Sequence, residues 1–265
     1  CYIYTKRPPA ESMTMARAAA LKALALDEGL AEAHVSLGNV RFLYDRDFPG
    51  AEGEFGRAIE VNPASVEAHH QYSHYLLATG RIEGSLRESR RALELDPLSP
   101  SINGHLALHY LLARQYDEAA DQCRRTLDLD SSYAPAHEFL GRTYEQQGKL
   151  REAIAEFQKT LELGGSPRDT LADLGHAYAI AGRRDEALKT LVRLRDLSKQ
   201  RYVSPVGFAL IYAGLGMKDE AFSWLDRAFR EHADELVFLE REPRLDSLRP
   251  DPRFTDLLRR IGLPS

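Results

Sequence analysis

The chain has 265 residues, of which 43% are hydrophobic, 28% charged and 9% aromatic, a composition typical of folded globular proteins. The net charge of -5 gives nucleic-acid binding no electrostatic support. The two cysteines, Cys1 and Cys123, are too few for a disulfide framework and lack zinc-type spacing, which favours a reducing, cytoplasmic location. The longest uncharged stretches, 98–113 and 202–217, are too short and too interrupted by Pro and Gly to cross a bilayer.

The beginning of the chain has neither an initiator methionine nor a signal sequence. A mature lipoprotein would also begin with cysteine, but a polar tether would then be expected after it. We therefore interpret the chain as a fragment of a longer protein.

A period of 34 residues runs through the sequence. Small residues recur with this step at Ala51, Ser85, Ala119, Ala153, Ala187 and Ala221. Tyrosines follow the same step at Tyr110, Tyr144, Tyr178 and Tyr212, and glycines at Gly80, Gly148, Gly182 and Gly216, with Arg114 at the intervening position. Several residue types sharing one period indicate a repeated structural unit.

Each unit carries apolar residues at helical spacing on both sides of its glycine, which predicts two helices and a turn. The glycine suits the left-handed residue that ends a helix, and Asp117, Asp185 and Asp219 are expected to cap the helices that follow. Near the start, one extra residue in the segment 44–50 predicts a bulged turn.

One unit contains Leu140-Gly141-x-x-Tyr144, then Gly148-Lys149-Leu150-x-x-Ala153 and Phe157, and resembles the tetratricopeptide repeat. The resemblance implies an all-α, right-handed superhelical solenoid of helix-turn-helix hairpins. Its units fall at 31–65, 66–99, 100–133, 134–167, 168–201 and 202–235, with half a unit before them. We expect residues 1–235 to form the solenoid and residues 236–265 to form a cap that ends in an amphipathic helix.

The region from Arg201 through the cap is similar to the C-terminal repeats of bacterial multidomain regulators, whose N-terminal parts are winged-helix, TolB-like or serine/threonine kinase domains. This similarity implies a role in signalling or transcription regulation for the parent protein.

Histidines form two pairs at i, i+4 spacing, His70 with His74 and His105 with His109. Such pairs can bind zinc, but a site needs further ligands and no His-Glu-x-x-His pattern is present. Polar packing is therefore the favoured interpretation, with no metal or other cofactor assigned. A further set, His34, His69 and His137, shares one register and is interpreted as packing residues.

The sequence gives little support for a catalytic site. Glu138, Glu145, Asp169 and Asp173 lie on neighbouring first helices and could act as paired acids, but solvated faces explain them better. Cys123 occupies an inward position and is interpreted as a buried, inert thiol. Phosphate-binding, kinase and serine-hydrolase motifs are absent from the sequence, so we predict no catalytic residue.

The concave surface is the expected binding surface, because the resemblance assigns partner contacts to the first helix of each hairpin. The corresponding residues are Asn39, Glu67, His70, His74, Leu77, Leu108, Leu111, Glu138, Arg142, Glu145, Asp169 and His176. Of the residues that bind a peptide carboxylate in chaperone-binding members, only Asn39 matches, and Val35 replaces the lysine. The apolar patch with its charged rows would instead suit an extended or helical peptide. Packing of these leucines between repeats is an equal alternative.

The sequence thus predicts a non-catalytic protein-interaction module with a protein or peptide partner and no bound membrane or nucleic acid. Alternatives are a sensor that holds a small ligand or metal in its concave groove, through His70, His74 and neighbours, and a structural spacer.

Overall fold

The computed structural model describes residues 9–263, which are helical apart from turns and short connections. Helix α1 (Pro9–Leu26) precedes six helical hairpins. These are α2 (Ala31–Val40) with α3 (Phe48–Val61), α4 (Val66–Ala78) with α5 (Ile82–Leu95), α6 (Pro100–Leu112) with α7 (Tyr116–Leu129), α8 (Ala134–Gln146) with α9 (Leu150–Glu162), α10 (Pro167–Ile180) with α11 (Arg184–Ser198), and α12 (Pro205–Gly214) with α13 (Lys218–Arg230). Across the described residues, none of these helices combines the length and apolarity needed to cross a bilayer.

The hairpin turns confirm the prediction for the periodic glycines. Gly80, Gly148, Gly182 and Gly216 all have φ between 73° and 80°, and Arg114 adopts the same left-handed conformation with φ of 63°. The prediction that Asp117, Asp185 and Asp219 are N-caps was wrong. The cap positions are Gln115, Arg183 and Met217, and the aspartates lie inside the first turn of each helix. There their negative charges interact favourably with the positive end of the helix dipole, but their side chains do not cap a free N–H group.

The extra residue predicted near position 44 is taken up by a π-helical turn, η2 (Arg41–Asp45), which continues α2. A π turn accommodates one more residue than an α-helical turn. Arg46 follows in the left-handed conformation with φ of 58°, and Asp47 then caps α3 by accepting a hydrogen bond from the Gly50 N–H. The hairpin is thereby kept despite its longer connection.

Close packing within each hairpin explains the periodic small residues. Ala51, Ser85, Ala119, Ala153, Ala187 and Ala221 are all fully buried. At Gly141 a Cβ atom would lie 2.6 Å from the Phe157 ring, which is itself fully buried. The two helices of a hairpin therefore pack closely, and stacking on the next hairpin buries the remaining apolar face.

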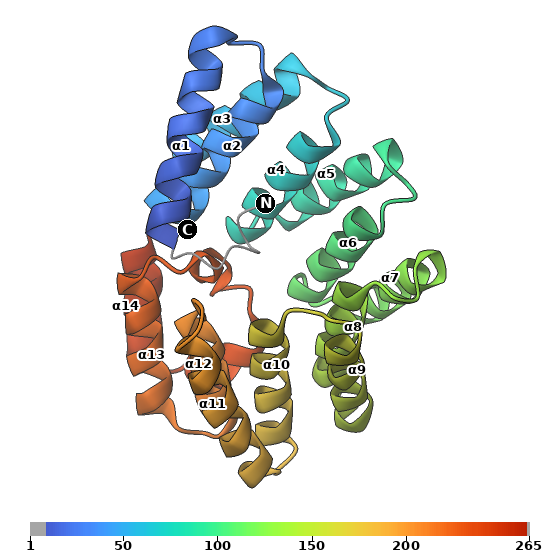
Figure 1. Cartoon of the computed structure of the whole chain (residues 1–265), viewed down its shortest axis with the longest axis vertical. Helices are drawn as coiled ribbons and strands as arrows, with labels where there is room; N and C mark the ends of the chain where they lie inside the picture. Colours follow the sequence, from blue (N-terminus) through green and yellow to red (C-terminus); the bar gives the residue numbers. More distant parts are fainter. Residues whose placement is uncertain (1–8, 264–265) are drawn as a thin grey trace.

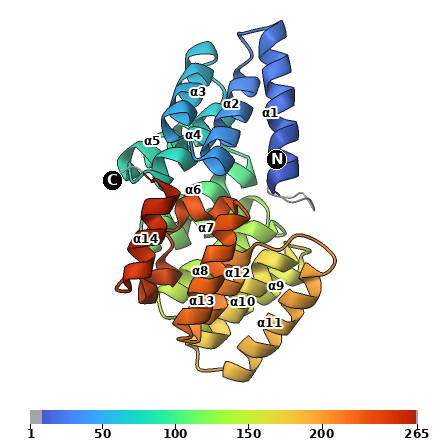
Figure 2. The ribbon, with the colours of Figure 1, turned by 90° about the vertical axis from the view of Figure 1, so that its left-hand side faces the viewer.

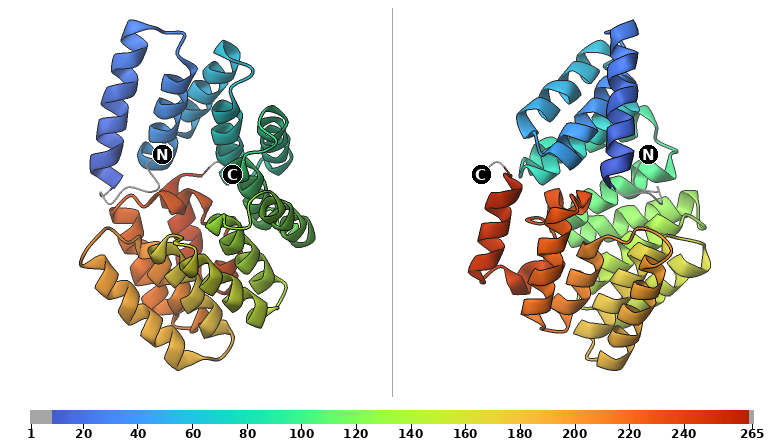
Figure 3. Two further views of the ribbon diagram at one scale, coloured as in Figure 1. Left: turned by 45° about the vertical axis from the view of Figure 1, so that its right-hand side comes forward. Right: turned by 60° about the vertical axis from the view of Figure 1, so that its left-hand side comes forward.

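The connection between α13 and α14 runs through the inside of the arc of hairpins, whereas α14 lies at its edge beside α13 (Figures 1, 2 and 3). After α13 follow the 3-10 helices η3 (Asp234–Phe238) and η4 (Pro243–Leu248) and then α14 (Pro252–Ile261). Leu236, Val237 and Leu245 share one hydrophobic cluster with Phe42 and Tyr75 of the early hairpins. The end of the chain therefore folds back and contacts the beginning of the solenoid, so that it caps more than the final hairpin.

Candidate functional site on the concave face

The predicted site residues lie on the first helices of five successive hairpins, α2, α4, α6, α8 and α10. Their environments differ. Leu77 and Leu111 are fully buried within the helix packing, whereas the Glu67 side chain is 56% exposed. Leu108 is half-buried beside the cluster formed by α6, α7 and α8. The structure thus places the leucines mainly in contacts between helices, and it also buries several polar members, among them His70, Glu145 and His176.

The chain's own residues 232–249, here called the C-terminal segment, cover much of this surface. His232 donates from Nδ1 to the Tyr44 carbonyl at 3.1 Å, and the Phe238 ring lies 6.0 Å from the Phe42 ring, centroid to centroid. Further along the arc, Asp246 accepts two hydrogen bonds of 2.7 Å from Arg114. The C-terminal segment therefore contacts hairpins that lie far apart in the sequence.

A buried charge network joins the C-terminal segment to α8 and α10. Arg142 donates to Glu242 at 2.9 Å, and Arg244 bonds to both Glu242 and Asp173 while its own side chain is only 5% exposed. The nearby Glu145 carboxylate lies 3.0 Å from His176 Nδ1. Of the predicted site residues, Arg142 belongs to this network, and the Glu145–His176 pair lies near enough for Glu145 to interact electrostatically with Arg244. Sequence reasoning missed its other half, because Glu242 and Arg244 lie in the expected cap.

The network shifts the pKa values of its acids in opposite directions. Burial alone would raise the pKa of Glu242, but the adjacent Arg244 and Arg142 guanidiniums outweigh burial and hold it well below its usual range. Burial, reinforced by the negative charges of Asp173 and Asp169, raises the pKa of Glu138 well above its usual range. Glu242 is therefore an anion held by arginines, whereas Glu138 favours its neutral form.

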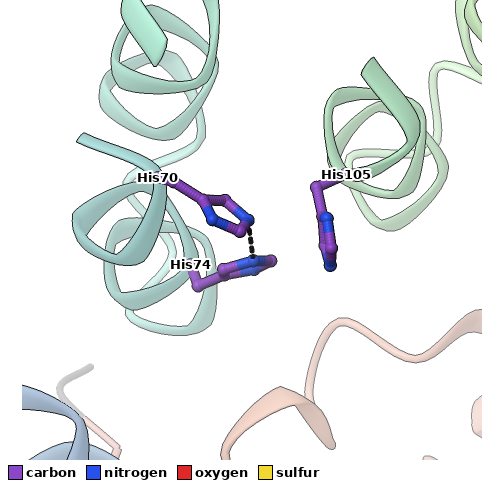
Figure 4. Close-up of side chains that lie close together, drawn as sticks. All are labelled: His70, His74 and His105. Atoms are coloured by element: carbon purple, nitrogen blue, oxygen red, sulfur yellow. Dashed lines mark hydrogen bonds between the residues drawn. The ribbon is translucent and has the colours of Figure 1, made fainter. Parts of the chain in front are cut away.

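The two predicted histidine pairs meet across neighbouring repeats (Figure 4). His70 and His74 of α4 face His105 of α6, and the Nε2 atoms of His70 and His74 lie 3.0 Å apart. His109 continues the row, with its Nε2 2.8 Å from His74 Nδ1. Burial, followed by the neighbouring imidazoles, lowers the pKa of His105 to about 3 and that of His74 and His109 well below their usual range. His74, His105 and His109 are consequently neutral at physiological pH.

The other histidine register has a structural role. His34, His69 and His137 each place Nδ1 within 2.7 Å of a glutamate on the second helix of the same hairpin, at Glu54, Glu88 and Glu156. Their Nε2 atoms face the carbonyls of Glu28, Pro63 and Ser131. These residues join the helices of one hairpin and do not open toward a ligand.

Comparisons with known proteins agree with this architecture. Residues 73–134 and 140–202 match the tetratricopeptide repeat family model. A search of curated proteins finds no match. Among solved structures, a chain of the APC/C hetero-tetramer Cut9–Hcn1 superposes with a TM-score of 0.63 at 18% identity, over 94% of this chain and 46% of that one. This chain therefore spans less than half the length of that protein.

Two bacterial structures are matched over more of their length. A tetratricopeptide repeat protein from Parabacteroides merdae gives a TM-score of 0.63 at 13% identity, covering 88% of this chain and 91% of that one. PilF of Pseudomonas aeruginosa gives 0.54 at 19% identity, covering 81% and 96%. At these identities the likeness concerns the fold. The likeness shows a helical solenoid fold, within which residues 73–134 and 140–202 match the tetratricopeptide repeat.

Proposed function

We propose that this chain is a non-catalytic protein-interaction scaffold whose concave face binds an extended protein segment. The supporting observation is that this face already holds such a segment from its own chain. Glu242 and Arg244, two residues apart, bond to Arg142 and Asp173, while Phe238 packs beside Phe42. A partner with an aromatic residue followed by an acid and an arginine would satisfy the same groups in place of the C-terminal segment.

A peptide-binding measurement tests this proposal. The probe is a fluorescent peptide of residues 234–249, and the proteins are the full chain and its Glu242→Ala/Arg244→Ala variant, in which the internal competitor is weakened. We expect the peptide to bind the variant more tightly than the wild-type chain, because a tethered segment competes at an effective concentration on the order of millimolar. Fluorescence anisotropy reports the two affinities.

A matched peptide with alanine at 242 and 244 is the control, and it should bind more weakly to the same variant. Adding Arg142→Glu to the variant should also remove binding of the natural peptide, because the acid that replaces arginine repels Glu242. Equal binding of both peptides, or no binding by a variant whose circular dichroism is native, would contradict the proposal.

We also propose that the scaffold is the interaction part of a larger bacterial signalling or transcription regulator in the cytoplasm. The similarity of residues 201–265 to the repeat regions of such regulators supports this. Reading the open reading frame upstream of Cys1 is the direct test. A winged-helix, TolB-like or kinase domain there is the expected result, and a signal peptide would refute the cytoplasmic location.

A sensor that holds a metal or small ligand on its concave face is the second candidate function. The convergence of His70, His74 and His105 favours it over the structural spacer, because imidazole nitrogens are the commonest metal ligands in proteins.

A further inference from the structure

The histidines of α4 and α6 form a cluster with an unusual hydrogen-bond arrangement. One ring nitrogen from each of His70, His74 and His105 lies at most 4.8 Å from those of the other two. His70 is 8% exposed, and its Nδ1 atom has no hydrogen-bond partner among the described residues. A buried polar atom without a partner is costly, and the nearest group that could bond to this one is the Glu67 carboxylate, 3.8 Å away.

The protonation of the two ring nitrogens of His105 shows which of them can bind a metal. Nδ1 of His105 lies 2.8 Å from the Ser101 carbonyl, which can only accept, so Nδ1 carries the proton. Nε2 of His105 is left with a lone pair. Between His70 and His74 the two Nε2 atoms lie 3.0 Å apart, a distance that one shared proton explains. If an ion took the place of that proton, both lone pairs would point at it.

Each of these imidazoles also has a group that can accept a hydrogen bond from its Nδ1–H. For His105 it is the Ser101 carbonyl. For His74 it is His109 Nε2 at 2.8 Å, and His109 in turn places Nδ1 2.6 Å from the Ser89 hydroxyl. For His70 it is the Glu67 carboxylate, 3.8 Å from Nδ1 and one small adjustment from a hydrogen bond. Metal-bound histidines almost always have such partners, which fix the tautomer and the ring orientation.

We propose that His70, His74 and His105 bind one divalent transition-metal ion through Nε2, and that Zn²⁺ is the ion this site fits best. His109, Ser89 and Glu67 act as positioning residues. The proposal deepens the second candidate function and does not depend on peptide binding by the concave face.

The geometry and chemistry favour zinc. Zinc binds imidazole nitrogen at about 2.0–2.1 Å, so two nitrogens of a tetrahedral site lie about 3.4 Å apart. The His70–His74 separation of 3.0 Å is near this value, and the largest separation of 4.8 Å closes with a movement of about 1.4 Å. Three nitrogen ligands leave one position for water, as in open zinc sites. Hard ions such as Mg²⁺ prefer oxygen ligands, which the three imidazoles do not supply.

The surroundings shelter the cluster while leaving it in reach of solvent. Phe238 of the C-terminal segment lies 6.2 Å from the His74 ring and Phe139 lies 6.1 Å from the His105 ring, centroid to centroid. The exposed Glu67 carboxylate supplies a negative charge at the edge of the site. A bound ion would link α4 to α6, and so connect two neighbouring repeats.

Zinc titration of the purified full chain tests the proposal, with binding measured by competition against a chromophoric chelator. The Cys1→Ser background removes the terminal thiol as a competing ligand. We expect one zinc per chain, and Co²⁺ in its place should give the strong visible absorption of a tetrahedral site. His105→Gln removes one ligand but keeps an amide that can donate to Ser101. His105→Gln should therefore weaken zinc binding strongly. Ser89→Ala removes one of the two hydroxyls beside His109 Nδ1, and we expect it to weaken zinc binding less than His105→Gln does.

His137→Gln is the matched control, because that histidine also lies on a first helix but pairs with Glu156. It should bind zinc as the wild-type chain does. Equal zinc affinity in the wild-type and His105→Gln chains, or no stoichiometric zinc in the wild-type chain, would overturn the site. The wild-type cobalt spectrum decides the matter even if a variant fails to fold, since a spectrum typical of six oxygen ligands would also refute it.

Discussion

Arg114 departs from the repeat pattern and makes a contact with a residue that is distant in the sequence. It occupies the turn position at which four other hairpins have glycine, with φ of 63°. A side chain in this conformation costs roughly 1 kcal/mol relative to glycine. Arg114 also holds Asp246 of the C-terminal segment, but both side chains are nearly half exposed. An exposed ion pair contributes only about 0–1 kcal/mol, so the two effects are of similar size.

Two substitutions at Arg114 separate these effects. Arg114→Ala loses the ion pair and keeps the strained backbone, so we expect it to lower the free energy of unfolding by about 0.5–1 kcal/mol. Arg114→Gly loses the same ion pair but relieves the strain, and should leave the stability within about 0.5 kcal/mol of wild type. Urea unfolding followed by circular dichroism measures both. An alanine variant as stable as the glycine variant would show that the turn is not strained.

At the scale of the hairpin, a polar pair joins the two helices at one recurring position. Three hairpins use histidine with glutamate, and the α6–α7 hairpin uses Asn103 with Gln122 at 2.8 Å. In that hairpin Asn103 also donates to the Pro97 carbonyl, as the histidines face a carbonyl six residues earlier. The position therefore requires a bridging polar group and not histidine itself.

This equivalence predicts that the pair can be exchanged as a unit. His137→Asn alone and Glu156→Gln alone should each cost about 1 kcal/mol, because each leaves a partly buried partner poorly matched. The double variant recreates the Asn103–Gln122 pair between α8 and α9, so it should be more stable than the sum of the single effects implies. A double-mutant cycle in urea measures the coupling, and a coupling energy of zero would refute the proposed equivalence.

The elements of the repeats could be predicted because their causes are local or periodic. Alanine, glycine and tyrosine recur wherever a hairpin closes or two hairpins pack, so the period of 34 fixes the helices. The meeting of the histidine pairs carried a signal that the sequence interpretation did not use. His70 and His105, like His74 and His109, are 35 residues apart, close to one repeat, which places them on adjacent first helices. Which rings then converge depends on side-chain packing, which the period does not determine.

At the scale of the whole molecule, the repeat pattern could not predict that the C-terminal segment folds back onto the solenoid. Arg114 and Asp246 are 132 residues apart, and Arg142 and Glu242 are 100 apart, so neither pair leaves a periodic trace. The segment binds because the arc presents apolar residues at one end and unpaired charges further along. Glu242 is the central anion of that contact, facing Arg142 and Arg244, with Asp173 and Glu145 as the neighbouring acids.

The depressed pKa of Glu242 makes the closure dependent on pH. An acid whose folded pKa lies below its unfolded value of about 4.3 stabilises the fold fully above that value, and this contribution is lost as the pH falls through the acidic range. Glu242→Gln keeps the shape of the side chain but removes its charge, so Arg142 and Arg244 lose the buried carboxylate to which both bond. Breaking a buried pair in this way costs about 3–5 kcal/mol, so the variant should be that much less stable at pH 7.

The difference in stability between wild type and Glu242→Gln should shrink below about pH 4, as Glu242 becomes protonated in the unfolded wild-type chain and finally in the folded one. Glu138 favours its neutral form when folded and acts in the opposite sense, but it is present in both proteins and largely cancels from the difference. Urea unfolding at a series of pH values measures the difference directly. A difference that stays constant from pH 7 to pH 3 would mean that the Glu242 charge does not hold the C-terminal segment on the concave face.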